Sequence, residues 1–404
     1  MLGPDNQSNS SDFEAILASE GVGYLLSGEE KVASLIPWDP FTFPSLHVPC
    51  PSGDGSTICL LFSANWCRPC RTFTPQLVQL YNTVRRSVGE EKLEIILVSL
   101  DRDETEFRQH YMCMPWLAVP FDVKLQQRLS KLYHVRHLPS LITLGVSGTL
   151  NQEDAVGLIQ EYGADAFPFT KKRKEELKAI DEAKRQGGKL DELLARGGRD
   201  YLVSGIGKEV WISELVGKTI GLYFGGNWCP PCHKFVEQLK EAYHELISTT
   251  NQSFEVVFVS TDKGEEDFNR HISNMPWLAI PYKDKTRQDL CRIFDIKRIP
   301  ALVLIAPNGS IIGTNGRAVI SLYGAMAYPF NESRIAEVEA LLRQQGDGLP
   351  QQVSNPKHEH VLKLVMAKAY VCDFCQKHGR FWSFSCDVCD YDLHPTCVDR
   401  TAGA

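Results

Sequence analysis

Paired cysteines are the residues of this chain whose type and spacing could do chemistry. Eight of the 13 cysteines stand in Cys-x-x-Cys pairs. The pairs are Cys67/Cys70, Cys229/Cys232, Cys372/Cys375 and Cys386/Cys389. Thiols at this spacing can close a reactive disulfide or clamp one edge of a metal tetrahedron. The polar, acidic N-terminal segment lacks the pattern of a secretory signal. We therefore expect a protein of the cytoplasm or nucleus that is not secreted, where these pairs are redox or metal sites rather than structural disulfides.

The first two pairs belong to a long internal repeat. Several segments return about 160 residues later. The repeated segments are Trp66–Cys70 with Trp228–Cys232, Met114–Pro120 with Met275–Pro281, and Leu138-Pro139 with Ile299-Pro300. Because this period is too long for a solenoid repeat, it indicates two copies of one domain.

Strand and helix patterns alternate in both copies. In the first copy an apolar run stops at the cysteine motif, and the segment behind the motif places apolar residues at helical spacing. The expected elements of the first copy are a strand at Thr57–Ser63, a helix at Arg71–Ser87, and strands at Leu93–Leu100 and Ser140–Gly145. Those of the second copy are a strand at Thr219–Phe224, a helix at His233–Ile247, and strands at Phe254–Ser260 and Ala301–Ala306. This alternation predicts an α/β fold in which helices cover both faces of a sheet.

Charged helices and glycines mark the ends of the copies. Lys171–Gln186 is expected to close the first copy before Gly187, and Asn331–Gln345 to close the second before the linker Gly346–Pro350. The remaining tail is too short to bury a hydrophobic core of its own, so a metal is expected to hold it. The expected domains are 13–187, 188–346 and 356–400.

The position of each motif predicts how its two cysteines divide the chemistry. The first cysteine, Cys67 or Cys229, falls at a helix N-terminus, where unpaired N–H groups and the helix dipole favour a thiolate nucleophile. The second, Cys70 or Cys232, falls one turn further on, inside the helix. A less exposed thiol there suits the resolving step, which attacks the mixed disulfide and releases the reduced target.

The motif set also resembles a known family. The two Trp-Cys-x-Pro-Cys motifs, the Met-Pro-Trp-Leu-Ala segments and the proline before a late strand resemble nucleoredoxins, in the tryparedoxin-like branch of the thioredoxin fold, and the whole chain looks like a plant nucleoredoxin. The resemblance implies two tandem thioredoxin-like domains with protein-disulfide reductase activity. It also implies that Pro139 and Pro300 are cis prolines that orient the substrate. Trp66 and Trp228 are expected to shield the sites and offer an apolar docking face.

The chain departs from the thioredoxin pattern at one point. That pattern has a buried acid five residues before the tryptophan, where this chain has Leu61 and Tyr223. The group that handles the proton of the resolving cysteine therefore stays open. A Cys-x-x-Cys pair can also be half of a zinc site, but neither of these pairs has a second Cys/His pair close by in sequence.

The C-terminal cysteines and histidines have the spacing of zinc ligands. They resemble the plant DC1 domain, a relative of the C1 finger of protein kinase C. The resemblance implies one zinc site formed by Cys372, Cys375, His394 and Cys397. It implies a second formed by Cys386 and Cys389 with histidine from the pair His358 and His360. The late cysteine of usual C1 patterns is missing, so the second site uses both histidines, takes another ligand or binds weakly.

Several features are open to more than one interpretation. The C-terminal module fits partner or lipid binding, a purely structural role, or release of zinc when its thiolates are oxidised. Phe381, Trp382 and Phe384 are expected to pack on the zinc layers rather than to form a lipid-binding tip. The Met-Pro-Trp-Leu-Ala segments fit a substrate groove or, as we prefer, a packed loop. Lys171–Lys174 fits a nuclear localisation signal or, as we prefer, a solvated helix face, because glutamates follow it at once.

The remaining observations indicate which partners and cofactors to expect. A net charge of -7 argues against nucleic acid, and no apolar stretch is long enough for a membrane span. Without a Gly-rich phosphate loop or dinucleotide fingerprint, we expect no tightly bound nicotinamide or flavin, so electrons must come from an NADPH-fed thioredoxin reductase or another dithiol donor. The predicted activity is reduction of disulfide-bearing proteins. The alternative is a redox-gated binding or adaptor protein whose disulfide state switches partner binding without turnover.

Overall fold

The fold confirms the α/β prediction. A computed structural model describes residues 17, 19–22, 24–28, 30–34, 57–144, 150–151, 155–250, 253–366 and 369–402. The chain divides into two compact units, Met1–Ala179 and Ile180–Ala404. Residues 13–16 of the expected first domain and Cys50 lie outside the described residues. The division into domains 13–187, 188–346 and 356–400 stays a proposal.

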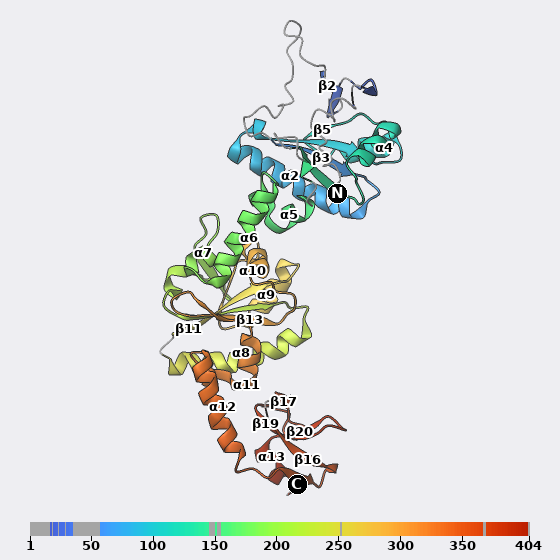
Figure 1. Cartoon of the computed structure of the whole chain (residues 1–404). Coiled ribbons are helices and arrows are strands. Elements are labelled where there is room, and N and C mark those ends of the chain that lie inside the picture. The colour runs from blue at the N-terminus through green and yellow to red at the C-terminus, as the bar shows by residue number, and fades with distance from the viewer. Residues whose placement is uncertain are drawn as a thin grey trace, which may run out of the picture. The chain divides into compact units, whose positions relative to one another are not determined.

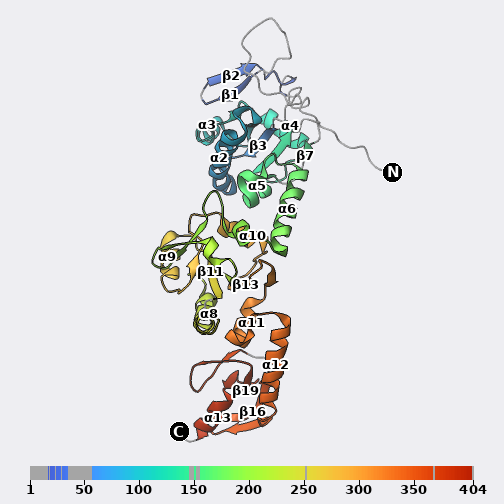
Figure 2. The ribbon, with the colours of Figure 1, turned by 90° about the vertical axis from the view of Figure 1, so that its left-hand side faces the viewer.

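The first unit is built on a sheet of seven strands in the order β2-β1-β5-β4-β3-β6-β7, with the β1–β2 ribbon at one edge (Figures 1 and 2). The strands are β1 (Tyr24–Ser27), β2 (Glu30–Ser34), β3 (Thr57–Ser63), β4 (Leu93–Ser99), β5 (Leu117–Ala118), β6 (Ser140–Leu144) and β7 (Leu150–Asn151). The helices are α2 (Arg68–Val88), α3 (Glu104–Tyr111), α4 (Val123–Leu132) and α5 (Ala155–Tyr162), with 3-10 turns η1 (Glu90–Lys92) and η2 (Gly163–Ala166). Helix α6 (Lys171–Gln186) begins in the first unit and ends in the second.

Strand β3 is central, and its side chains alternate between two cores. β3 pairs in parallel with β4 and antiparallel with β6. Leu61 points into the core formed with α2, α3 and α5, whereas Leu60 and Phe62 point into the core formed with α4. Both faces are covered, which explains why β3 is apolar without a break. Helix α2 begins at Arg68, three residues before the predicted start, because Pro69 fits the first turn, where its missing N–H loses no bond.

The second unit repeats this architecture in the order β14-β13-β10-β11-β12-β8-β9. The strands are β8 (Tyr201–Ser204), β9 (Glu209–Trp211), β10 (Thr219–Gly225), β11 (Phe254–Ser260), β12 (Leu278–Ala279), β13 (Ala301–Ile305) and β14 (Ile311–Gly313). The helices are α7 (Leu190–Leu194), α8 (Pro230–Thr249), α9 (Glu265–Ile272), α10 (Thr286–Ile293), α11 (Gly316–Tyr323) and α12 (Glu332–Gly346), with 3-10 turns η3 (Ile212–Leu215) and η4 (Gly324–Ala327).

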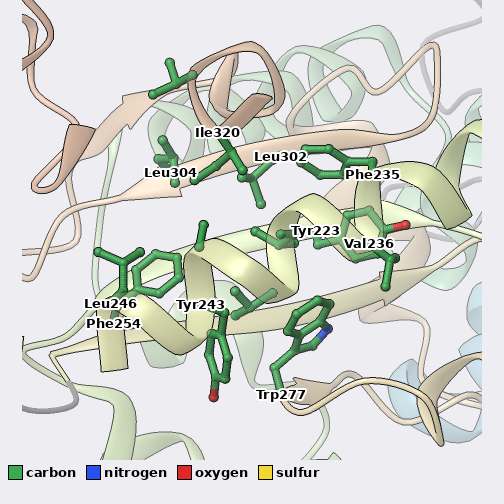
Figure 3. Packing of buried hydrophobic residues seen from close by; sticks show 14 of the residues in the cluster. Tyr223, Phe235, Val236, Tyr243, Leu246, Phe254, Trp277, Leu302, Leu304 and Ile320 are labelled. Atoms are coloured by element: carbon green, nitrogen blue, oxygen red, sulfur yellow. The ribbon is translucent and has the colours of Figure 1, made fainter. Parts of the chain in front are cut away.

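An aromatic cluster fills one core of this second sheet (Figure 3). The Tyr223 ring of β10 lies 6.3 Å from the Trp277 ring, and the Tyr243 ring of α8 lies 5.6 Å from it. Both contacts are edge-on, the arrangement that aromatic rings prefer. Trp277 is almost fully buried, as is Trp116 in the first copy. The packed-loop interpretation of the Met-Pro-Trp-Leu-Ala segments is therefore confirmed.

The C-terminal module belongs to the second unit. Its four-stranded sheet runs β15 (Gln352–Asn355), β16 (His358–Met366), β19 (Trp382–Cys386) and β20 (Tyr391–Leu393), beside the pair β17 (Tyr370–Val371) and β18 (His378–Gly379) and helix α13 (Pro395–Ala402). The core of the module is small. Apolar residues such as Leu362, Phe384 and Leu393 form it together with buried cysteines.

Two aromatic residues of this module pack outside it. Phe381 joins the large aromatic core of the second unit, and the indole N–H of Trp382 donates to the Leu342 carbonyl of α12 at 2.7 Å. Figure 2 shows α12 running beside β19. The prediction that these two rings pack on the zinc layers is wrong, because they pack on an apolar surface of the neighbouring helices. For Phe384 the prediction is confirmed, since its ring lies in the core of the module beside the cysteines.

Two further expectations concern the basic run at Lys171–Lys174 and the absence of a membrane span. Lys171–Lys174 lies in the first turn of α6, with Lys171 and Lys172 exposed, as the solvated-face interpretation predicts. Within the described ranges, no helix combines the length and apolar character needed to cross a membrane.

Candidate active sites and metal clusters

The first cysteine pair stands where β3 runs into α2. Cys67 is the N-cap of α2, and its sulfur accepts a hydrogen bond from the Cys70 amide at 3.3 Å. An N–H aimed at a sulfur at a helix N-terminus favours negative charge on that sulfur. Cys67 is 6% exposed and Cys70 is fully buried. Cys67 is thus the member of the pair that a partner can reach.

The buried sulfur of this pair holds its proton strongly. Burial raises the pKa of Cys70 to about 11, a contact with Cys67 raises it as well, and hydrogen bonds from Ser63 and from the backbone of Ala64 act in the opposite direction. A thiol attacks a disulfide only as the thiolate. The geometry thus leaves Cys70 protonated at neutral pH, and its proton must be removed before it can attack.

The second pair has the same position between β10 and α8. Cys229 is the N-cap of α8 and Cys232 lies in its first turn; the two are joined by a disulfide, with Cα atoms 5.3 Å apart. Cys229 is 4% exposed and Cys232 is fully buried. The sulfur of Cys229 lies 3.9 Å from the carbonyl oxygen of Ile299. The segment before Pro300 therefore lies against the redox pair.

Both expected cis prolines are present. The Leu138-Pro139 and Ile299-Pro300 bonds are cis, and Leu138 packs against Cys67 and Cys70. Two further cis bonds, at Pro168 and Pro329, were not predicted. They belong to the repeated Phe/Tyr-Pro-Phe segments, whose repetition was the available signal.

The tryptophans before the cysteines lie at the surface. Trp66 is 47% exposed and Trp228 is 61% exposed. The indole N–H of Trp66 donates to the Leu100 carbonyl at 3.0 Å, and the Arg102 guanidinium lies over its ring. These rings are apolar surfaces beside each reachable cysteine, which is where a docking partner would meet them.

A buried polar network beneath the first pair escaped the sequence analysis. The Ser63 hydroxyl lies 3.4 Å from Nε2 of His110, and Nδ1 of His110 lies 3.1 Å from Oδ2 of Asp101. The other carboxylate oxygen of Asp101 accepts a hydrogen bond from the Asn65 amide at 2.6 Å, and Ser99 donates to Oδ2 at 2.7 Å. The available signal was a repeat, since each copy has Ser-x-Asp after its second strand and histidine nine residues later.

The second copy keeps only part of this network. Asp262 accepts hydrogen bonds from the Asn227 amide and from Ser260, as in the first copy. His271 lies 3.7 Å from Asp262, and neither of its ring nitrogens has a hydrogen-bond partner among the described residues. Gly225 takes the place of Ser63, because a Cβ there would run into the Tyr223 hydroxyl.

The C-terminal module brings together two groups of potential metal ligands. The first group is Cys372, Cys375, His394 and Cys397, and the second is His358, His360, Cys386 and Cys389. Within each group the ligand atoms lie within 4.8 Å of one another. These are the sets that the resemblance implied, and the second uses both histidines.

The first group has the donor chemistry of a structural zinc site. The sulfur of Cys375 lies 3.3 Å from Nδ1 of His394, and Nε2 of His394 lies 3.1 Å from the His378 carbonyl. A ligating histidine typically donates its other ring N–H to such a carbonyl. The Lys377 amide lowers the pKa of Cys375 to about 7, whereas burial raises that of Cys397 to about 11. Metal binding deprotonates cysteine ligands of either kind.

The second group contains an unpaired buried nitrogen. Nε2 of His358 is buried and has no hydrogen-bond partner in the described part of the chain. Its ring stacks on Tyr391 at 4.4 Å, and the sulfur of Cys389 lies 3.3 Å from Nδ1 of His360. A buried nitrogen without a partner is costly unless it binds a ligand. This set therefore also fits a metal ion.

The remaining thiols are not arranged for redox chemistry. Cys59 is a core residue, and burial raises its pKa to about 12. Burial likewise raises the pKa of Cys291 to about 11. Cys113 is exposed and donates to the His110 carbonyl at 3.1 Å, beside no other cysteine in the described residues.

Comparisons with known proteins agree with this architecture. A thioredoxin-like family matches residues 55–150 and 217–311, and the C1 domain family matches residues 356–398. A probable nucleoredoxin 3 from Arabidopsis thaliana is 54% identical over 97% of this chain and 95% of its own length. The chain belongs to the nucleoredoxin family. A probable nucleoredoxin 3 from Oryza sativa subsp. japonica is 49% identical over 87% of this chain and 72% of its own length.

More distant relatives cover less of the chain. Nucleoredoxin from Homo sapiens is 32% identical over 56% of this chain and 48% of its own length. Among solved structures, native tryparedoxin I from Crithidia fasciculata is 34% identical, covering 35% of this chain and 98% of that chain with a TM-score of 0.33. The nucleoredoxin assignment confirms the resemblance seen in the sequence, including the duplicated thioredoxin-like domain and the C1 module, and it supports thiol–disulfide oxidoreductase chemistry.

Proposed function

We propose that this nucleoredoxin reduces protein disulfides at two sites. Cys67 and Cys229 would be the attacking residues, and Cys70 and Cys232 would resolve. The observation that carries this proposal is the shared geometry of the two sites: a helix-capping cysteine that keeps a small exposed fraction and a fully buried one in the first turn. Trp66, Trp228, Pro139 and Pro300 would orient the substrate chain.

The reaction balances as two thiol exchanges. A thiolate of Cys67 or Cys229 attacks the target disulfide, forms a mixed disulfide and expels one target thiolate, which takes a proton from water. The resolving thiolate attacks the mixed disulfide, expels the second target thiolate and leaves the protein oxidised. A dithiol donor, such as an NADPH-fed thioredoxin reductase, supplies two electrons to restore both thiols.

Insulin reduction tests this proposal. The full chain is assayed with NADPH and thioredoxin reductase, and in parallel with dithiothreitol as donor, alongside Cys67→Ser, Cys229→Ser and the double variant. We expect turnover that falls in the single variants and vanishes in the double variant. Turnover with dithiothreitol alone would refute the thioredoxin reductase partner. No turnover with either donor would refute the enzyme and favour the redox-gated binding protein.

We further propose that the two C-terminal ligand groups bind zinc. The sulfur and imidazole donors suit zinc, and four protein ligands leave no open position, so the ion would have a structural role. When bound, zinc would supply folding free energy that the small module core lacks. Metal analysis of the purified chain should give about two zinc ions per molecule. Cys372→Ser and Cys389→Ser should each remove about one.

A further inference from the structure

We propose that Ser63, His110 and Asp101 form a proton relay for Cys70, in place of the buried acid that this chain lacks. The inference rests on the proposed function, because it assumes that Cys70 resolves. Ser63 touches the reacting thiol. His110 and Asp101 act through Ser63 and are positioning residues.

The relay is buried. Ser63 ends β3 next to the first turn of α2, where its hydroxyl acts to lower the pKa of the Cys70 thiol. This hydroxyl lies 3.4 Å from Nε2 of His110, whose Nδ1 lies 3.1 Å from Asp101. All four residues are 3% exposed or less. A proton leaving Cys70 therefore has a route along hydrogen bonds, where water has little access.

The hydrogen bond between Asp101 and His110 fixes the tautomer that such a transfer needs. Burial raises the pKa of Asp101, but hydrogen bonds from His110, Ser99 and the Asn65 amide outweigh it and hold the pKa below its usual range. An ionised carboxylate only accepts, so Nδ1 of His110 must carry the hydrogen. Nε2 is then free to accept the Ser63 proton. Once the Ser63 hydroxyl has turned from the Cys70 sulfur to Nε2, its oxygen can accept the proton of Cys70.

The transfer balances over one catalytic cycle. As Cys70 attacks the mixed disulfide at Cys67, its proton passes to Ser63 while the Ser63 proton passes to His110. The imidazolium that forms pairs with the Asp101 carboxylate, and the negative charge leaves with the expelled target thiolate. When the dithiol donor cleaves the Cys67–Cys70 disulfide, the Cys70 thiolate leaves and takes this proton back.

The second copy shows that this network is not a general requirement of the fold. It has the equivalent aspartate and histidine, but Gly225 and the Tyr223 hydroxyl occupy the position where Ser63 links the network to the resolving cysteine. We therefore infer a division of labour, in which the first site alone has the relay.

The test uses the full chain with Cys229→Ser and Cys232→Ser, which silence the second site. The reduced protein is mixed with oxidised glutathione, the reaction is quenched with acid, and the protein mass is measured by mass spectrometry. The rate of Cys67 glutathionylation and the rate of its resolution by Cys70 are thus obtained separately. Ser63→Ala removes the link and Ser63→Thr restores a hydroxyl. Ser260→Ala, the same type of substitution in the silenced copy, is the control.

We expect Ser63→Ala to slow resolution about 100-fold near neutral pH and to leave glutathionylation unchanged. Its resolution rate should rise about tenfold per pH unit toward the Cys70 pKa of about 11, while the parent rate changes less. The titratable groups facing the relay are Cys67 and Cys70 from α2, His110 from α3 and Asp101 after β4. Ser63→Thr should recover most of the rate, and Ser260→Ala should behave as the parent.

Two results would overturn the relay. One is resolution in Ser63→Ala at the parent rate with the parent pH profile. The other is an equal loss of both steps at every pH, which would show a structural role for the hydroxyl. Since glutathione is a small chemical probe, normal resolution without insulin turnover would refute the proposed reductase function and leave the relay standing.

Discussion

Replacing Tyr223 by phenylalanine should stabilise the second unit, although it alters a fully buried residue. The Tyr223 hydroxyl is buried and has no hydrogen-bond partner among the described residues. Leaving a buried hydroxyl unpaired costs about 1–3 kcal/mol. Phenylalanine keeps the ring contacts, including stacking on Phe258 at 5.4 Å. We therefore expect Tyr223→Phe to raise the free energy of unfolding by about 1–2 kcal/mol.

The same substitution at Tyr243 is the matched control. Tyr243 belongs to the same aromatic core, but its hydroxyl donates to Oε1 of Glu255 at 3.0 Å. Burial raises the pKa of Glu255, and the bond to Tyr243 partly offsets that effect. Tyr243→Phe should therefore destabilise the unit by about 1 kcal/mol, the usual net worth of such a bond.

Amide hydrogen exchange read by mass spectrometry measures both effects on the full chain. In the β10 peptide, 219–225, exchange through global unfolding should slow by about 5- to 30-fold in Tyr223→Phe and quicken several-fold in Tyr243→Phe. Equal destabilisation by both variants would refute the reasoning, because it would mean that the Tyr223 hydroxyl has a partner, such as a buried water.

Three further predictions follow from the same geometry. Cys70→Ser should accumulate mixed disulfides between Cys67 and target proteins, which non-reducing gels detect. They should be absent when Cys67→Ser is added, and equal amounts in the single and the double variant would contradict the assigned order of attack. Because the pKa of Asp101 is lowered in the folded state, its stabilisation is present above its unfolded pKa of about 4 and is lost as pH falls through the lower folded value. The free energy of unfolding of the first unit should therefore fall less steeply with decreasing pH in Asp101→Asn. An unchanged pH dependence would argue against the His110 and Ser99 contacts. A zinc chelator should expose amides of residues 352–402 to exchange while protection of 219–225 is retained; unchanged protection of the tail would mean that its core suffices without metal.

Local patterns explain what the sequence could predict. The apolar run of β3, the helical spacing of α2 and the Cys-x-x-Cys pairs depend on residues a few positions apart, so their elements were located within about three residues. The duplication was visible because the same motifs return at a constant distance. Ligand spacing likewise predicted both metal-binding groups of the C-terminal module.

Non-local packing explains what the sequence analysis missed. Ser63 and His110 are 47 residues apart, and they meet only because β3 and α3 pack against one another. Phe381 and Trp382 were assigned to the zinc layers because nothing near them in sequence shows the surface of α11 and α12 that accepts them. Such contacts depend on which elements become neighbours.

By itself, the sequence determined the α/β architecture, the repeat, the two redox motifs and the ligand sets, since hydrophobic period and side-chain chemistry are properties of short segments. Tertiary structure alone decided how deeply each cysteine is buried, and hence why Cys70 holds its proton. It also decided that one site has a serine–histidine–aspartate network while the other, with Gly225 and Tyr223, does not. The physical reason is that burial and hydrogen-bond partners come from residues distant in the chain, which only folding brings within a few ångströms.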